Sequence, residues 1–589
     1  MLEEIDKQES APGLSNLPLR PAGQVMDLAR LGCYHPTRLS FMRTLMRRVM
    51  SEQWQIAPVI FDLDADGFGT VVYEIKAPGG TYSFVLFSDD IDPLQRNDRV
   101  IATRWDLTMA LCEGRVDATY LAQLRNNVRQ QEAGRFDSRV FVLSRANRSL
   151  RNFELIVSGL AAGNQPDLGQ VAQVGYLYRT TAVYGSGKMG MADWAKVSTK
   201  YPDFARPFAA EMFSCFMLRH FSLLQVDHIA KARAPATAVV MDDNIRRYFG
   251  IGNSTGMGMA PYLVMHPLLV SQWIEVLETA LARVVHFGVV TADHLRRLRE
   301  MAGKVIQHIG QVTAESELQT ASNLLLVEDM HSLVAWLDLR GESLSSWAQL
   351  QSHAESHWRT EAGEVIKSLL IEMYPALVDD LEEQMSVEEV QDIQPEMSLV
   401  DLESLIERHY GWALDIDFER AEAQHLFWYR SEDKLEPRIG QRDIDPGKDR
   451  EMALAIGQAV QGCYRQVKAQ RKQHADSNVA RLLLAQPKLK GVVRRIQTMS
   501  QRLYGEIQEN LLDKNLIPVH LLRCKLTFFG VSKFNPLSQR WVRNTMFQGA
   551  PIVGDIGKPF ADDWYFPITP DSQEGKLDEH VANGSNRSI

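Results

Sequence analysis

The order of apolar and polar residues predicts strands in the first third of the chain. Between residues 55 and 87, three short runs rich in β-branched and aromatic residues (IAPVIFDLD, TVVYEIK and YSFVLF) are separated by DADGFG and APGG. This pattern is typical of a hairpin or a three-strand meander. Two later runs, RVFVLS at 139–144 and VGYLYRTTAV at 174–183, could add strands to the same sheet. We therefore expect residues 25–195 to form an α+β domain with a small antiparallel sheet, preceded by a flexible tail at 1–24.

The pattern changes after residue 195. From Phe204 to about Lys514 long stretches are rich in Leu, Ala, Glu, Gln and Arg, which favours helices. Residues 196–514 are therefore expected to form one or more helical domains. Residues 515–569 are rich in aromatics, Gly and Pro and suggest strands or extended loops, and 570–589 are polar and expected to be disordered. The predicted fold is mainly α: an N-terminal α+β part with a small antiparallel sheet, followed by a multi-helix bundle.

Composition narrows the class of protein. Of the 589 residues, 45% are hydrophobic and 23% charged, which is typical of a packed globular chain. No apolar run approaches the roughly 20 residues that cross a bilayer, and the acidic N-terminus does not resemble a signal peptide. We expect a cytoplasmic protein without membrane contact. The five cysteines show no CxxC spacing, so reduced, mostly buried thiols are expected and no metal site is predicted.

The most distinctive segment is Gly250–Pro261, GIGNSTGMGMAP. It lies between a probable helix at 242–249 and an apolar helix expected to start near residue 260. Glycines, backbone N–H groups and hydroxyls at the start of a helix suit a phosphate or a carboxylate. The candidate ligand-binding residues are Asn253, Ser254, Thr255, Gly256 and Gly258. Equally, the glycines could serve only a tight turn and close helix packing. The segment matches neither a Walker A motif nor a dinucleotide fingerprint, so no cofactor is named.

A second glycine-rich segment, YGSGKMGMAD at 184–193, follows the strand-like run that contains Arg179. The order strand, glycine loop, helix is one in which loops bind phosphates, and Lys188 could neutralise the anion. Ser186 and Gly187 complete the candidate set. The alternative is an exposed loop with a solvated lysine. If the two segments converge, they form one pocket.

Candidate acid–base residues lie on a predicted buried helix, 211–233. His220 and Asp227 are seven residues apart and share a face, and His228 is adjacent. Such residues could transfer protons, or they could simply satisfy each other within the core. His266, early in the helix expected after the first glycine segment, could also point toward an anion.

Charge patterning limits other functions. Asp62, Asp64 and Asp66 resemble the start of a calcium loop, but position 12 of that loop is Tyr73, so a hairpin turn is the better interpretation.

An acidic block at 379–403 and a basic block at 465–502 could pair within the chain or between subunits, which would make a homo-oligomer. The net charge of −10 argues against a dedicated nucleic-acid binder.

Three hypotheses follow. The first is a soluble enzyme for a small carboxylate- or phosphate-bearing metabolite, with both glycine segments binding the anion and His220, Asp227, His228 or His266 moving protons. The second is a non-enzymatic helical scaffold or regulatory protein, which predicts that the two segments lie far apart. The third is a protein that contacts nucleic acid through residues 465–502.

Overall fold

The computed structural model describes most of the chain. The described residues are 17–90, 105–130, 139–172, 174–180, 200–256, 267–312, 317–340, 343–385, 393–419, 439–441, 450–452, 456–500, 502–505, 518–536, 541–559 and 562–569. They form two compact units: residues 1–35, 257–298 and 336–525 make the first, and 36–256, 299–335 and 526–589 make the second.

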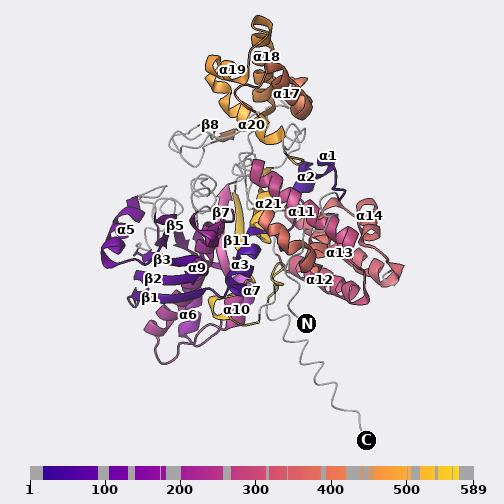
Figure 1. Cartoon of the computed structure of the whole chain (residues 1–589). Coiled ribbons are helices and arrows are strands. Elements are labelled where there is room, and N and C mark those ends of the chain that lie inside the picture. The colour runs from indigo at the N-terminus through magenta and orange to yellow at the C-terminus, as the bar shows by residue number, and fades with distance from the viewer. Residues whose placement is uncertain are drawn as a thin grey trace, which may run out of the picture. The chain divides into compact units, whose positions relative to one another are not determined.

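The second unit is built on a large mixed sheet (Figure 1). Within the described residues the sheet has nine strands in the order β1-β2-β3-β4-β5-β6-β7-β11-β10. The strands are β1 (Gln55–Leu63), β2 (Gly69–Ala77), β3 (Gly80–Ser88), β4 (Leu107–Glu113), β5 (Val140–Arg148), β6 (Tyr176–Thr180), β7 (Gly250–Gly256), β10 (Lys533–Pro536) and β11 (Trp541–Met546). All neighbours are antiparallel except β6 and β7, which are parallel.

The prediction of a small antiparallel sheet is therefore wrong. The strand-like runs predicted from the sequence do form β1, β2, β3, β5 and β6, but β4 was not predicted, and three further strands come from residues far along the chain. These strands extend the sheet beyond β6 and introduce the parallel pair. About 58% of the structure is helix and 15% strand, so the expected order of an α+β part followed by helices holds in part.

The predicted hairpin at 62–69 is confirmed. β1 and β2 pair in antiparallel register from Gln55 opposite Lys76 to Leu63 opposite Gly69. The Asp64 carboxylate closes the turn by accepting hydrogen bonds from the backbone N–H groups of Asp66 (3.0 Å) and Phe68 (2.9 Å). This is the local bonding that makes Asp frequent in turns.

Helices cover both faces of this sheet. The helical elements of the second unit are α3 (Phe41–Ser51), α5 (Ala118–Gln130), α6 (Phe153–Ala161), α7 (Leu168–Ala172), α9 (Ala209–Arg233) and α10 (Asp243–Tyr248), with short 3-10 turns at Pro202–Phe204 and Val553–Asp555. α9 packs on β4 to β7 and is itself covered by α3 and α6. Because α9 is enclosed on nearly all sides, it is apolar around most of its circumference.

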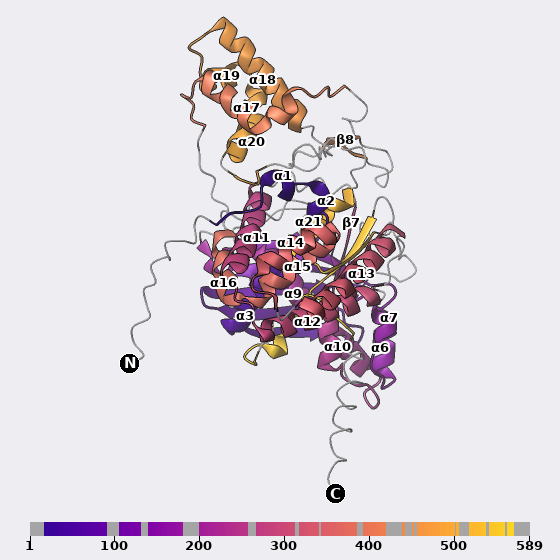
Figure 2. The same ribbon diagram turned by 90° about the vertical axis from the view of Figure 1, so that its right-hand side faces the viewer.

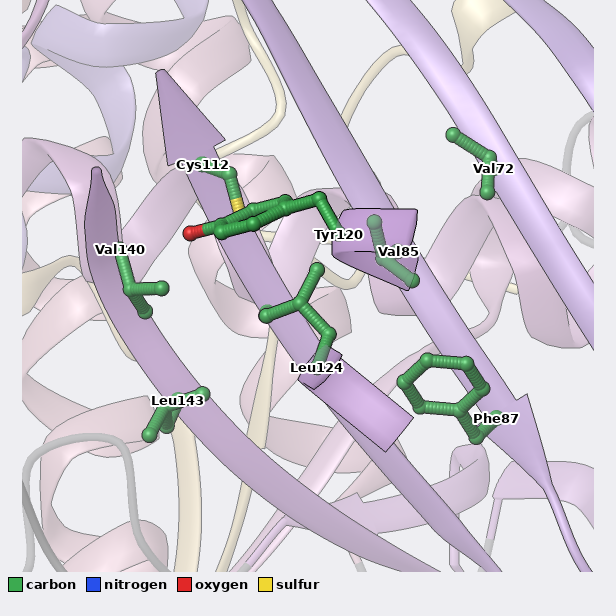
Figure 3. Packing of buried hydrophobic residues seen from close by; sticks show 9 residues of the cluster. Val72, Val85, Phe87, Cys112, Tyr120, Leu124, Val140 and Leu143 are labelled. Atoms are coloured by element: carbon green, nitrogen blue, oxygen red, sulfur yellow. The ribbon is translucent and has the colours of Figure 1, made fainter. Parts of the chain in front are cut away.

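The opposite face of β2 to β5 is covered by α5. Figure 3 shows Tyr120 and Leu124 of α5 lying over Val85, Cys112 and Val140 of the strands. Alternation along β3 explains this arrangement, because Val85 and Phe87 point toward α5 while Ser88, which accepts a hydrogen bond from Gln225 of α9, points the other way.

The first unit is helical. It contains α1 (Ala22–Val25), α2 (Leu28–Leu31), α11 (Pro267–Phe287), α14 (Trp347–His357), α15 (Thr360–Met373), α16 (Pro375–Val378), α17 (Leu399–Leu414), α18 (Ile456–Gln473), α19 (Val479–Ala485) and α20 (Lys490–Ser500), 3-10 segments at Asp379–Met385 and Pro487–Leu489, and the strand pair β8 (Ile439–Gln441) and β9 (Arg450–Met452). Helices α12 (Ala292–Gln311), α13 (Glu317–Arg340) and α21 (Pro518–Phe529) belong in part to each unit. α17 to α20 form the small bundle visible in Figure 2.

A buried charge network ties Arg20, which precedes α1, to helices α2, α11 and α15. The Arg20 guanidinium contacts Glu278 (2.7 Å) and Glu364 (3.0 Å), and Lys367 contacts Glu364 (2.5 Å). Burial alone would raise the pKa of Glu364, but the charges of Lys367, Arg20 and Arg30 hold it well below its usual range. Every carboxylate in the network is thus matched by a cation, which is the condition under which buried charges are tolerated.

We predict that truncating the α5 contact destabilises the sheet. Leu124→Ala removes a fully buried side chain and should lower the free energy of unfolding by about 2–5 kcal/mol. The measurement is urea unfolding followed by circular dichroism. The matched change Leu155→Ala, at a position 48% exposed on α6, should cost less than about 0.5 kcal/mol. Equal losses in both variants would contradict the assignment of this cluster as core.

Candidate anion-binding site

The parallel pair β6 and β7 places the first glycine-rich segment, whose residues 250–256 form β7, beside the strand that precedes the second segment in the sequence. Thr180, the last residue of β6, is the register partner of Asn253 in β7. Because parallel strands end at the same edge, the chain leaves both strands side by side. Ligands of open sheets that contain parallel strands commonly bind outside these carboxyl ends.

The residues Gly250–Gly256 are a strand, so the expectation of a glycine loop is wrong for this part of the segment. β7 pairs with β6 on one side and with β11 on the other. The glycines are needed for close approach: a Cβ at Gly252 would lie 2.5 Å from atoms of the Tyr176 ring, and one at Gly250 would lie 2.3 Å from the Met546 carbonyl oxygen. Bulkier residues would not fit between the two neighbouring strands.

Positive charge gathers around Tyr176, against Gly252. Burial raises the pKa of the Tyr176 hydroxyl, while the charges of Arg543, Arg179 and Arg151 act to lower it, which places all three guanidinium groups within electrostatic range of it. Arg179 is the register partner of Gly252, and Arg543 that of Ser254. Both arginines are half-buried. Planar guanidinium groups next to a hydroxyl donor suit the two oxygens of a carboxylate or phosphate.

Asn253 has a structural partner. Its side-chain amide is buried and donates a hydrogen bond to the Thr180 carbonyl oxygen (3.0 Å). Between β5 and β6 the hydroxyls of Ser144 and Thr180 are 3.3 Å apart. These contacts fix the separation of β5, β6 and β7 at the edge where the strands end.

The predicted ligand-binding residues are only partly described. Arg179 in β6 and Asn253, Ser254, Thr255 and Gly256 in β7 lie on adjacent strands. The remaining members lie outside the described residues: Ser186, Gly187, Lys188 and Gly258, together with the candidate acid–base residue His266.

The other candidate acid–base residues are all on α9, each with a partner of its own. His220 lies against the Tyr73 ring of β2, with ring centroids 5.4 Å apart. Asp227 forms an ion pair with Arg246 of α10 and accepts a hydrogen bond from the Met241 N–H (3.1 Å). The His228 ring donates to the Asp64 carbonyl oxygen (2.8 Å). These contacts correspond to a structural interpretation of the three side chains, although the sequence suggested that His and Asp satisfy each other and their partners lie on other elements.

Electrostatics agree with that interpretation for His220. Burial, reinforced by the charges of Arg246 and Arg219, lowers the pKa of His220 to about 3. Burial raises the pKa of Asp227, although Arg246 opposes this. At neutral pH His220 is therefore a neutral ring with little affinity for a proton.

Arg219 is a buried cation within the largely apolar helix α9. Its guanidinium donates to the backbone carbonyls of Phe249 (2.6 Å), Pro551 (2.7 Å) and Ala550 (2.8 Å), and also to those of Arg246 and Arg247. It therefore binds the residue before β7 and the turn after β11 to α9. Burial acts to lower the pKa of Arg219, and the carbonyl dipoles compensate the cost of burying the charge.

Tyr176 and Arg543 were missed by sequence reasoning. Tyr176 stood in a run already assigned to a strand, and Arg543 lies in a C-terminal stretch whose pairing with β7 has no local signal. Alternation in RWVRNTM indicates a strand but not its partner.

Further properties of the described residues bear on the class of protein. They contain no cluster of three or more His, Cys, Asp or Glu side chains arranged to hold a metal ion. None of the helices in these parts of the chain combines the length and apolar character needed to span a bilayer. None of the five cysteines, which all lie in the described residues, forms a disulfide, and all but Cys33 are buried, as expected. Comparison of the chain with protein-family models, curated proteins and solved structures gives no match.

The close packing around Gly252 predicts that a methyl group added there destabilises the protein, whereas one added at a glycine with open space around it does not. Gly252→Ala should destabilise the protein by about 1–3 kcal/mol because the new methyl overlaps the Tyr176 ring. Gly303→Ala, in the interior of α12 with open space around it, should instead be neutral or stabilising by up to about 1 kcal/mol. Chemical denaturation measures both, and a stabilising Gly252→Ala would refute the packing argument.

Burial of His220 predicts a pH dependence of stability. Below pH 6.5 the unfolded chain takes up a proton that the folded chain does not, so the free energy of unfolding falls as the pH falls. Between pH 7 and pH 5 this group should cost about 2 kcal/mol of stability.

The measurement for this prediction is urea unfolding at pH 7 and pH 5. His220→Gln should lose about 2 kcal/mol less than the parent across this interval. His331→Gln, at an exposed position of α13, should behave like the parent. If His220→Gln retains the full pH dependence of the parent, the histidine is not buried in its neutral form.

Proposed function

We propose that this protein binds a small carboxylate- or phosphate-bearing metabolite at the edge of the sheet where β6 and β7 end. The observation that carries the proposal is the parallel register of Thr180 with Asn253, because β7 belongs to the first glycine-rich segment and the second follows β6 in the sequence. The scaffold hypothesis expects the two segments to be far apart. The pairing of the first segment with the strand that precedes the second therefore favours a ligand site.

The charge at this edge supports an anionic ligand. Arg179 and Arg543 flank β7 from the strands on either side, and their charges reach the Tyr176 hydroxyl. An anion held there receives donors from two rigid strands, which costs less conformational entropy than a site made only of loops.

A catalytic step would need a group that transfers protons. His220 packs against Tyr73. Asp227 is bound by Arg246 and by the Met241 N–H. Of the predicted acid–base residues, His266 follows β7 in the sequence, after the second half of the glycine-rich segment. We therefore propose His266 as the first residue to examine for a proton-transferring role in an enzyme of this kind.

The test is a thermal-shift titration of the full chain with inorganic phosphate, succinate, glycerol phosphate and a nucleoside monophosphate. At 100 times its dissociation constant a bound probe should add about 2.7 kcal/mol of apparent stability. Arg179→Gln and Arg543→Gln should each weaken the response at least about tenfold in probe concentration, because each removes a charged hydrogen-bonding partner.

The control is Arg296→Gln, an exposed arginine of α12 that forms an ion pair with the nearby Asp293. It changes the net charge equally and should leave the titration unchanged. If no carboxylate or phosphate stabilises the parent, or if all three variants respond alike, the site does not bind anions.

A further inference from the structure

The small bundle carries a stretch of chain without acidic residues. From Ser477 to Gly505 the sequence contains no Asp or Glu and six Lys or Arg, at positions 481, 488, 490, 494, 495 and 502. This stretch covers α19, the 3-10 turn Pro487–Leu489 and α20. Although the whole chain is acidic, binding to a polyanion depends on local charge.

The acidic side chains of α17 pair with α18. Glu403 contacts Arg471 (2.5 Å) and Lys468 (3.6 Å), and Glu407 accepts a hydrogen bond from the Tyr464 hydroxyl. The expected pairing of acidic and basic blocks within the chain is therefore realised at the end of the acidic block. It involves the α18 part of the basic block, and the positive charge of α19 and α20 remains in excess over the acids of the bundle.

The fold exposes basic side chains of α19, α20 and the turn between them to solvent. Val493, Ile496 and Met499 form the apolar side of α20 and are buried, and α20 packs against α17 and α18. Lys488, Lys490 and Arg494 are exposed, as is Arg481 on α19. The result is a basic surface on helices of the bundle, which we call the α19–α20 surface and define by Arg481, Lys488, Lys490 and Arg494.

Two observations select the class of partner. The apolar side of α20 is already used inside the bundle, so the helix cannot insert it into a membrane as interfacial helices do. The only aromatic residue between 477 and 505 is Tyr504, which is buried and donates to the Arg20 carbonyl oxygen (2.6 Å). A surface that is basic but offers no aromatic platform suits the phosphates of a duplex better than the bases of a single strand.

We propose that the α19–α20 surface binds the phosphate backbone of double-stranded nucleic acid. The contacts are made by charge and are independent of base sequence. Each phosphate neutralised by one of these side chains releases condensed counterions, so binding weakens as salt is raised. This role is independent of the anion site in the second unit.

The experiment is fluorescence anisotropy of the full chain with labelled DNA and RNA duplexes of about 20–30 base pairs, from about 50 to 200 mM salt. The parent should bind at least one duplex, with affinity that falls steeply over this range. The triple variant K488Q/K490Q/R494Q should bind at least about tenfold more weakly at the low-salt end, and its salt slope should be smaller by about 3 because three contacts are lost.

A charge-matched control separates this surface from general charge effects. The triple variant K76Q/K231Q/K558Q removes three lysines from the second unit and should bind duplex within about twofold of the parent. Matching circular dichroism and thermal midpoints establish that both variants are folded.

Four outcomes would overturn the proposal. These are absence of duplex binding at low salt, equal weakening in both triple variants, tighter binding to a single strand of the same length, and binding to vesicles of anionic lipid that depends on the same three side chains while duplex binding does not.

Discussion

The second unit depends on one buried cation. Arg219 projects from α9 and donates hydrogen bonds to five carbonyl oxygens, on the chain entering β7 and on the turn that follows β11. A guanidinium is the one side chain with enough donors to satisfy such a set. Without it these carbonyls would lose a charged hydrogen-bond donor, and the two segments would lose their common attachment to the central helix.

The candidate site is a consequence of that attachment. Once β7 is held beside β6, their parallel register fixes where both glycine-rich segments begin, and β11 contributes Arg543 from the other side. The arginines that supply charge thus come from β6 and β11, two strands that are distant in sequence. The site is positioned by the sheet as a whole and not by a local motif.

Sequence reasoning succeeded where structure is local. The hairpins of β1 to β3 follow from alternation and turn residues, and the helix that carries His220 and Asp227 follows from its composition. The stretch Gly250–Gly256 was misread because glycine, asparagine and serine have little tendency to form strands. At this position the neighbouring strands determine the conformation. Tyr176 and the Met546 carbonyl leave room only for glycine, and pairing with β6 and β11 supplies the hydrogen bonds. The partners of His220 and Asp227, Tyr73 and Arg246, are equally non-local.

The position of β11 in the chain also has a consequence for synthesis on the ribosome. β7 ends at Gly256 and its partner β11 begins only at Trp541, so β7 is an open edge of the nascent sheet for roughly 15–60 s at typical rates of elongation. Exposed strand edges recruit other chains when they are rich in β-branched and aromatic residues. A waiting edge made of glycine, asparagine, serine and threonine, with the single branched apolar residue Ile251, is a poor template for such pairing. The composition that lets β7 fit into the finished sheet also protects it until its partner strand has been made.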